Sequence, residues 1–245
     1  MICQTCQKDN PGGLPYCTFC GSPLLVTEEN PAGLEWVQIP EGTYLSGCMF
    51  DLFSKDIPVK TSAFKISKYP VTNAQYQLFL NDTPSINPPK YWNIEKRTYP
   101  DGKDNYPVTH VSYGDATAFC KWGGYRLPDD SEWEKTARGT DGRTYPWGET
   151  WKDGELCNTE ESGIGETTPV DAYPQGVSPY GVWDLSGNVS EWTSARGKNN
   201  ITAKIVKGGS YSLNRYSAEC ACNSESSVND DWEGNGFRCV KFIRC

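Results

Sequence analysis

The chain has 245 residues, of which 37% are hydrophobic and 13% aromatic, and its formal net charge at pH 7 is -8. This length and composition can bury a real core, which excludes a disordered chain. The acidic balance disfavours a nucleic-acid partner held by a broad cationic surface, and no run approaches the roughly 20 apolar residues of a membrane-spanning helix. The N-terminus also lacks the layout of a signal peptide, so we expect a reducing, cytoplasmic location.

Four cysteines near the N-terminus form two knuckles, Cys3-x-x-Cys6 and Cys17-x-x-Cys20. Four thiolates at this spacing favour tetrahedral zinc, and a segment this short buries too little to fold without its metal. Two disulfides in a secreted tail are the alternative, which the missing signal sequence disfavours. The knuckles therefore predict a zinc ribbon with structural zinc as cofactor.

Domain boundaries follow from this motif and from the polar stretch behind it. We predict the zinc ribbon over residues 1–27, a linker over residues 28–33 and a larger domain over residues 34–245. Only Lys8 and Asp9 carry charge within the ribbon, so it has no basic stripe for DNA. A docking or tethering module is the expected role.

The larger domain mixes short strand-like runs with three helix signatures and many Gly, Pro and Asn turns, which predicts an α+β fold with long loops. Alternating apolar residues predict strands over residues 36–39 and 64–66. A first helix is predicted to begin at Val71-Thr72-Asn73. Its inward-facing positions are Ala74, Tyr76, Phe79 and Leu80.

Two further helices are predicted from capping boxes, in which a side chain at the helix start and an acid three residues later exchange hydrogen bonds. Ser112 with Asp115 begins the second helix, which ends at Gly123-Gly124. Asp129 with Glu132 begins the third, which ends at Gly139.

The chain contains one histidine, His110. Multi-histidine iron or zinc sites need several imidazoles, and a catalytic triad needs its imidazole next to the other triad residues. The single histidine therefore restricts the enzyme classes that are possible for this chain. Its setting, Val108-Thr109-His110-Val111, is apolar and alternating. We therefore predict that His110 is a core residue with its polar atoms satisfied.

These elements in this order resemble the formylglycine-generating enzyme, or sulfatase-modifying factor, family over nearly all of residues 34–245. The segments that carry the resemblance are Ile39–Thr43, Tyr69–Tyr76, His110–Tyr113 through Tyr125–Pro128, Glu132–Lys135, Tyr145–Gly148, Gly187–Trp192, Gly208–Tyr211 and Gly236–Arg238. The resemblance implies a C-type lectin fold of the formylglycine-generating-enzyme type, with little regular structure and a core of aromatic residues.

The oxidase of the resembled family holds copper with two cysteines shortly after its Gly-Gly-Ser-Tyr motif. The matching positions here are Leu213 and Ala218, which cannot ligate a metal. The resemblance then implies that this chemistry is lost, and we expect a non-catalytic ligand-binding protein rather than an enzyme. The alternative is a copper- or thiol-dependent oxidase of the same type that uses Cys220 and Cys222.

The polar segment of residues 212–235 lies between two motifs of the resembled family and has the length of the variable region in diversity-generating retroelement proteins. In those proteins the fold displays a diversified binding face, so a protein ligand is expected here. A solvated loop and a carbohydrate lectin are weaker alternatives. The candidate ligand-binding residues are Ser212, Leu213, Asn214, Tyr216, Ser217, Glu219, Cys222, Asn223, Asn229, Asp230, Asp231 and Trp232.

Calcium is the other cofactor that the resemblance implies, held in the loop around the Gly-Asn-Val-x-Glu-Trp motif. The matching ligands are the side chains of Asp184 and Glu191 and the carbonyl oxygens of Gly187 and Val189, all hard oxygen donors. In the alternative, Glu191 pairs with a nearby arginine or lysine and no calcium binds.

Overall fold

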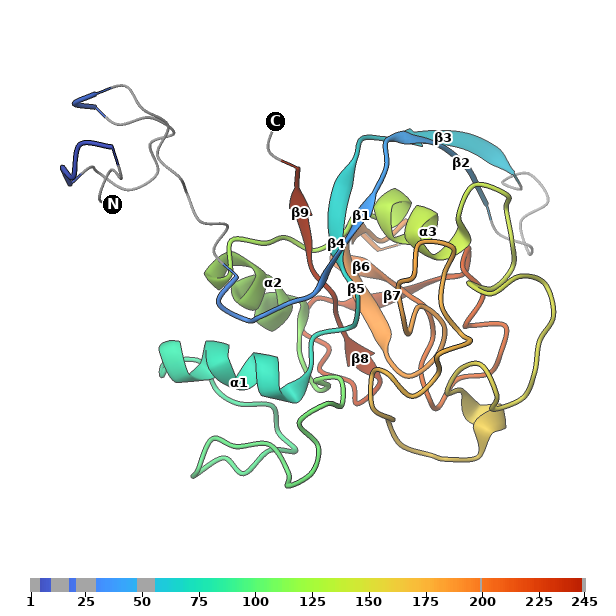
Figure 1. Cartoon of the computed structure of the whole chain (residues 1–245). Coiled ribbons are helices and arrows are strands. Elements are labelled where there is room, and N and C mark those ends of the chain that lie inside the picture. Colours follow the sequence, from blue (N-terminus) through green and yellow to red (C-terminus); the bar gives the residue numbers. More distant parts are fainter. Residues whose placement is uncertain (1–4, 10–17, 21–29, 48–55, 199, 244–245) are drawn as a thin grey trace. The chain divides into compact units, whose positions relative to one another are not determined.

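The chain divides into two units, Met1–Pro31 and Ala32–Cys245. A computed structural model describes residues 5–9, 18–20, 30–47, 56–198 and 200–243 (Figure 1). No helix in this described part is long and apolar enough to cross a membrane.

The first unit is described at two short turns, each of which carries one predicted zinc ligand, Cys6 or Cys20. The ammonium group of Lys8 lies 4.6 Å from the ring centre of Phe19, which links the two turns. Cys3 and Cys17 lie outside the described residues, so the zinc ribbon stays a prediction.

The second unit contains three small sheets. Their strands are β1 (Trp36–Ile39), β2 (Gly42–Ser46), β3 (Ile57–Thr61), β4 (Phe64–Ser67), β5 (Ser190–Arg196), β6 (Ala203–Lys207), β7 (Asn223–Ser227), β8 (Asn235–Gly236) and β9 (Val240–Phe242). The strand orders are β1-β4-β9, β2-β3 and β7-β6-β5-β8. All pairs are antiparallel except β5 with β8, which run parallel.

Three helices, α1 (Asn73–Asp82), α2 (Tyr113–Trp122) and α3 (Asp130–Arg138), confirm the helix predictions. Each begins with a capping box, and α3 ends at Gly139. Helices α1 and α2 pack side by side, while α3 lies against β2, β3 and β5 (Figure 1). On α1, the residues Tyr76, Phe79 and Leu80 are buried as predicted, and Ala74 is half-buried.

Long loops make up most of the chain between α3 and β5. The only helical element described there is the single 3-10 turn Glu160–Ser162. This low content of regular structure confirms the predicted α+β class with long loops. Positions in these loops are therefore set by hydrogen bonds and side-chain packing rather than by helices or strands.

Aromatic rings form the larger core. The rings of Tyr76 and Phe119 stack with centres 5.7 Å apart, and Phe237 lies edge-on 5.3 Å from Phe119. Trp192 is fully buried in the same cluster. Such pairs contribute beyond their buried area, so rings joining α1, α2 and the chain next to β8 stabilise the unit.

A buried ion pair between Arg238 and Glu191 crosses the centre of this unit. Both residues are 0% exposed, and the Nε and Nη2 atoms of Arg238 lie 2.6 and 2.7 Å from the two carboxylate oxygens of Glu191. The indole nitrogen of Trp133 on α3 also donates to Glu191, at 2.7 Å. Arg238 further donates to the carbonyl oxygens of Ser67 on β4 and of Trp183. One side-chain pair thus joins three elements and a loop.

We predict that Arg238→Met destabilises the protein by about 3–5 kcal/mol, because it leaves the carboxylate of Glu191 buried without a cation. Urea unfolding followed by tryptophan fluorescence measures the loss. The control is Lys60→Met, which breaks the exposed Lys60–Glu41 pair and should change the unfolding midpoint little. Equal shifts for the two variants would contradict the assigned role of the buried pair.

Candidate active site

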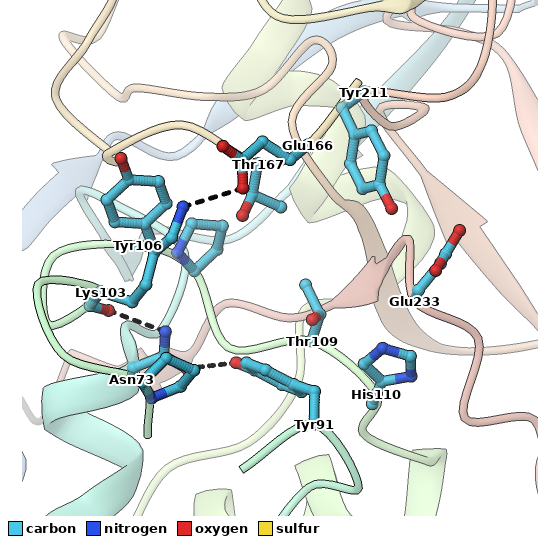
Figure 2. Close-up of a pocket in the computed structure, with 12 residues that line it drawn as sticks. Asn73, Tyr91, Lys103, Tyr106, Thr109, His110, Glu166, Thr167, Tyr211 and Glu233 are labelled. Carbon is cyan, nitrogen blue, oxygen red and sulfur yellow. Dashed lines mark hydrogen bonds and ion pairs between the residues drawn. The ribbon is translucent and has the colours of Figure 1, made fainter. Parts of the chain in front are cut away.

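A cavity of about 260 Å³ opens beside the first residue of α1 and is lined by three tyrosines, so we call it the tyrosine pocket (Figure 2). Its lining residues are Asn73, Tyr91, Pro100, Lys103, Tyr106, Pro107, Thr109, His110, Glu166, Thr167, Tyr211 and Glu233. They come from α1, from the loops before α2 and after α3, and from the chain on either side of β7.

The N-terminus of α1 fixes one wall of the tyrosine pocket. The side-chain amide of Asn73 donates to the carbonyl oxygen of Lys103 at 2.8 Å, and the hydroxyl of Tyr91 donates to the side-chain oxygen of Asn73. The backbone nitrogen of Asn73 also donates to the carbonyl oxygen of Tyr106 at 2.9 Å. A single buried asparagine therefore holds two of the three tyrosines.

Lys103 and Glu166 form an ion pair at the same cavity, with 3.0 Å between Nζ and Oε2. The ammonium group of Lys103 also lies 3.9 Å from the ring centre of Tyr106. The positive charge of Lys103 is therefore already balanced by a carboxylate and an aromatic face.

His110 lines the tyrosine pocket, so the prediction that it is a core residue is wrong. It is half-buried, and its φ of 54° lies in the left-handed region. Such a backbone conformation is uncommon in a non-glycine residue and is often found at functional sites.

The hydrogen bonds of His110 define its protonation. Its Nδ1 atom lies 3.1 Å from the carbonyl oxygen of Asp231. A carbonyl oxygen only accepts, so we assign the proton to Nδ1 and an available lone pair to Nε2. Burial, followed by the nearby charge of Lys90, holds the pKa of His110 below its ordinary value. The imidazole is therefore neutral at pH 7 and able to accept a proton.

Tyr211 and Glu233 complete the opposite wall (Figure 2). Burial, followed by the negative charge of the nearby Glu233 carboxylate, raises the pKa of Tyr211. The turn before Tyr211 requires glycine, because Gly209 has a φ of 66° and a Cβ there would lie 2.9 Å from the backbone of Ser217. A base, a phenol and a carboxylate thus face one cavity, which suits proton transfer.

A second cavity of about 260 Å³ shares His110 with the tyrosine pocket. Lys90 and Asp231 lie on its border and form an ion pair with 3.0 Å between Nζ and Oδ1. This pair anchors the segment whose carbonyl oxygen orients His110.

The predicted ligand-binding residues do not form one displayed loop. Residues 223–227 form strand β7 within the four-stranded sheet, and Glu219 is only 3% exposed, which removes it from any surface. The exposed members are Ser212, Asn214, Tyr216 and Asn229, and the half-buried members are Leu213, Ser217, Cys222, Asn223, Asp230, Asp231 and Trp232. A protein ligand for this segment stays a prediction.

The cysteines near this segment do not fit a copper centre in the described structure. Leu213 and Ala218 occupy the expected ligand positions. Cys220 is fully buried, and burial raises the pKa of its thiol, whereas a copper ligand must be a thiolate. Cys222 is half-buried. Among the described residues, no group of three or more His, Cys, Asp or Glu side chains is arranged to hold a metal ion.

The predicted calcium ligands are only partly arranged for an ion. Asp184 is buried, which raises its pKa to about 8, and its Oδ2 accepts a hydrogen bond from the side chain of Asn188 at 2.7 Å. A cation would relieve the desolvation of this carboxylate. Both oxygens of Glu191, however, accept from Arg238, as the arginine alternative expected. The calcium site stays a prediction.

The sequence alone does not identify most of the polar and titratable residues that line the pocket. Tyr211 was recognised only as part of a family motif, and Glu233 only as part of a polar segment. Tyr91, Lys103 and Tyr106 lie in a stretch without a motif. The one available signal was Asn73 at a helix start, where a buried amide must find partners elsewhere in the chain.

Comparisons with known proteins identify the family. Residues 22–243 match the family described as "Sulfatase-modifying factor enzyme 1-like domain". The formylglycine-generating enzyme of Mus musculus is 28% identical over 299 residues, covering 92% of this chain and 80% of that protein. The enzyme of the same name from Thermomonospora curvata is 31% identical over 290 residues, covering 83% of this chain and 92% of that protein. The hercynine oxygenase of Mycolicibacterium thermoresistibile is 33% identical over 164 residues, covering 56% and 36%.

These relatives contradict the prediction that the chain is not an enzyme, because they carry the names of enzymes. The prediction depended on two positions that lack cysteine. A missing cysteine pair excludes one way of holding copper, but it does not exclude other chemistry in the cavity of the same fold.

Solved structures show the same fold. PvdO from Pseudomonas aeruginosa superposes with a TM-score of 0.72 at 20% identity, covering 86% of this chain and 95% of that one. Treponema denticola variable protein 1 gives a TM-score of 0.72 at 17% identity, covering 85% and 95%. The expected resemblance, including that to variable proteins with a C-type lectin fold, is confirmed for the fold.

We predict that the imidazole of His110 titrates below pH 6.5, because desolvation and Lys90 both disfavour its charged form. The chain has one histidine, so every imidazole resonance in the proton NMR spectrum belongs to His110 and reports this pKa without further assignment. Lys90→Met removes the cation and frees Asp231, and both changes should raise the pKa. A midpoint at or above 6.5 in the unaltered protein would contradict the assignment.

We also predict one zinc ion per chain, because four cysteines have the spacing of a zinc ribbon. Elemental analysis of the purified protein measures the ratio. Replacing Cys6 and Cys20 with serine should abolish it, whereas replacing the buried Cys157 with serine should leave it unchanged. Zinc retained by the double variant would exclude the ribbon.

Proposed function

This chain belongs to the family of sulfatase-modifying factor enzyme 1-like domains, and we propose that it is an enzyme whose substrate reacts in the tyrosine pocket. The observation that carries the proposal is the convergence of His110, Tyr211 and Glu233 on one cavity (Figure 2). In this proposal the Nε2 atom of His110 accepts a proton from the substrate.

The surroundings of His110 support this role. The carbonyl oxygen of Asp231 holds the proton on Nδ1, which leaves Nε2 as the basic nitrogen. The lowered pKa of His110 keeps that nitrogen unprotonated at neutral pH. General bases work best when they are deprotonated at the operating pH and fixed in orientation, and His110 meets both conditions.

Tyr211 supplies the complementary group. Its pKa is raised, so the phenol stays protonated and serves as a hydrogen-bond donor next to the reacting molecule. Glu233 lines the pocket with this phenol, and its negative charge helps to keep the phenol protonated. The pocket therefore offers an acceptor and a donor, and the ion pair of Lys103 with Glu166 defines a further wall.

The names of the relatives support enzymatic chemistry, since one is named an oxygenase and others are named formylglycine-generating enzymes, the family whose oxidase the sequence resemblance associates with copper. The copper of that family would supply oxygen activation, but the residues at its positions, Leu213 and Ala218, do not fit it. The proposal therefore assigns only binding, orientation and proton transfer to the residues of this chain.

A second candidate, a copper- or thiol-dependent oxidase using Cys220 and Cys222, is favoured by the same relatives. It requires Cys220 to leave the core and lose its proton, against the burial that raises its thiol pKa. Cu(I) competition with a chromogenic chelator tests it. Tight copper binding that disappears in the Cys220→Ser, Cys222→Ser double variant would favour this candidate over the first.

Mass-spectrometric product analysis together with oxygen uptake, for the purified chain with a panel of amino acids, amines and cysteine-containing peptides, tests the proposed function, because the first readout also detects turnover that consumes no oxygen. For any substrate found, His110→Gln should lower turnover about 100-fold or more, because the proton acceptor is lost. Tyr211→Phe should lower turnover, while the matched change Tyr216→Phe, on an exposed tyrosine outside the pocket, should not.

Two outcomes would contradict the proposal. Turnover that is unchanged in His110→Gln would remove the assigned base. Turnover that is lost in the double cysteine variant but retained in His110→Gln would move the reaction to the thiol site.

A further inference from the structure

The charges around the tyrosine pocket do not balance. Lys103 is neutralised by Glu166 at 3.0 Å, and His110 carries its single proton on the nitrogen that faces the carbonyl oxygen of Asp231. Glu233 remains. Among the residues that the structure describes, no lysine or arginine forms an ion pair with its carboxylate, which is solvent-exposed and lines the pocket together with Tyr211. The pocket therefore carries one uncompensated negative charge.

Aromatic rings surround this charge. Tyr91, Tyr106 and Tyr211 contribute three of the lining residues. The face of Tyr106 already attracts a cation, because the ammonium group of Lys103 lies 3.9 Å from its ring centre. The ring of Tyr91 lies 5.3 Å from that of His110, so it extends the aromatic wall toward the base. Aromatic faces next to a carboxylate attract organic cations through the ring quadrupole and through Coulomb attraction together.

An anionic ligand is disfavoured by the same arrangement. Lys103 is the one lysine of the lining, and its ammonium group is engaged by Glu166 and by the Tyr106 ring. An anion would have to displace Glu166 and would still face Glu233. The volume of about 260 Å³ also limits the occupant to a compact molecule or to one end of a larger one.

We propose that the tyrosine pocket binds a compact alkylammonium group, with its positive charge against the Glu233 carboxylate and its carbon atoms against the tyrosine rings. The inference rests on the proposed function, because it takes this pocket as the substrate site. The substrate class that follows is an amine with a short aliphatic chain, free or at the end of a larger molecule.

Three probes of similar size test the charge preference, namely butylammonium, 1-butanol and butanoate, each added at constant ionic strength. The single imidazole of His110 lies at the pocket and reports occupancy through its NMR shift. Butylammonium should saturate this shift at concentrations about tenfold lower than the other two probes, since a charge-assisted hydrogen bond is worth about one order of magnitude in affinity.

Two carboxylate variants locate the charge. Glu233→Gln should abolish the preference for butylammonium over 1-butanol. Glu149→Gln removes an exposed carboxylate of another cavity and should leave the preference intact. Stronger binding of butanoate, or an unchanged preference in Glu233→Gln, would overturn the inference.

The inference and the proposed function fail in different ways. Calorimetric titration of His110→Gln with butylammonium separates binding from catalysis, because this variant lacks the base but keeps Glu233. If butylammonium binds but turnover does not depend on His110, the proposed function is contradicted and this inference is not. If turnover requires His110 but the pocket shows no preference for butylammonium, this inference is contradicted and the proposed function is not.

Discussion

The ion pair of Arg238 with Glu191 brings distant segments of the second unit together at one buried point. It is fully buried, and it is compensated by hydrogen bonds from Trp133 and to the carbonyl oxygens of Ser67 and Trp183. An uncompensated charge at this depth is prohibitive, so helix α3, strands β4 and β5 and the chain after β8 must meet at one point. In a chain with so few helices and strands, this point replaces the framework that regular elements usually supply.

The pocket depends on that meeting point. Strand β8 pairs in parallel with β5 at Ser190 and Glu191, and the nitrogen of Ser190 donates to the carbonyl oxygen of Gly234 at 2.7 Å. This contact places Glu233 directly beside the pocket. Strand β6 pairs with β5 through Glu191 and leads into the glycine turn that presents Tyr211. Two residues of the site are therefore positioned by the strands that flank the buried pair.

Much of the fold could be predicted from local signals, whereas most of the site could not. The helix start at Val71-Thr72-Asn73, two capping boxes and the alternating runs at residues 36–39 and 64–66 located the three helices and two of the strands, since these signals lie within a few residues of one another. His110 was misplaced because its apolar neighbours predict burial, whereas the residue is half-buried and lines a cavity. Tyr211 and Glu233 line one pocket although strand β7 separates them along the chain, so no local sequence pattern links them. The prediction that the chain is not an enzyme gave too much weight to the absent cysteine pair, since that pair concerns copper binding rather than the whole site.

The proposed role of His110 as a base in the tyrosine pocket can be tested through the pH dependence of kcat/KM for the first identified substrate, because that profile reports the ionisation of the free enzyme. We expect kcat/KM to rise with pH through an inflection below 6.5, the direction in which burial moves the pKa of His110, and we expect this inflection to disappear in His110→Gln. A profile that is flat across this range, or an inflection that survives the substitution, would contradict the proposed role.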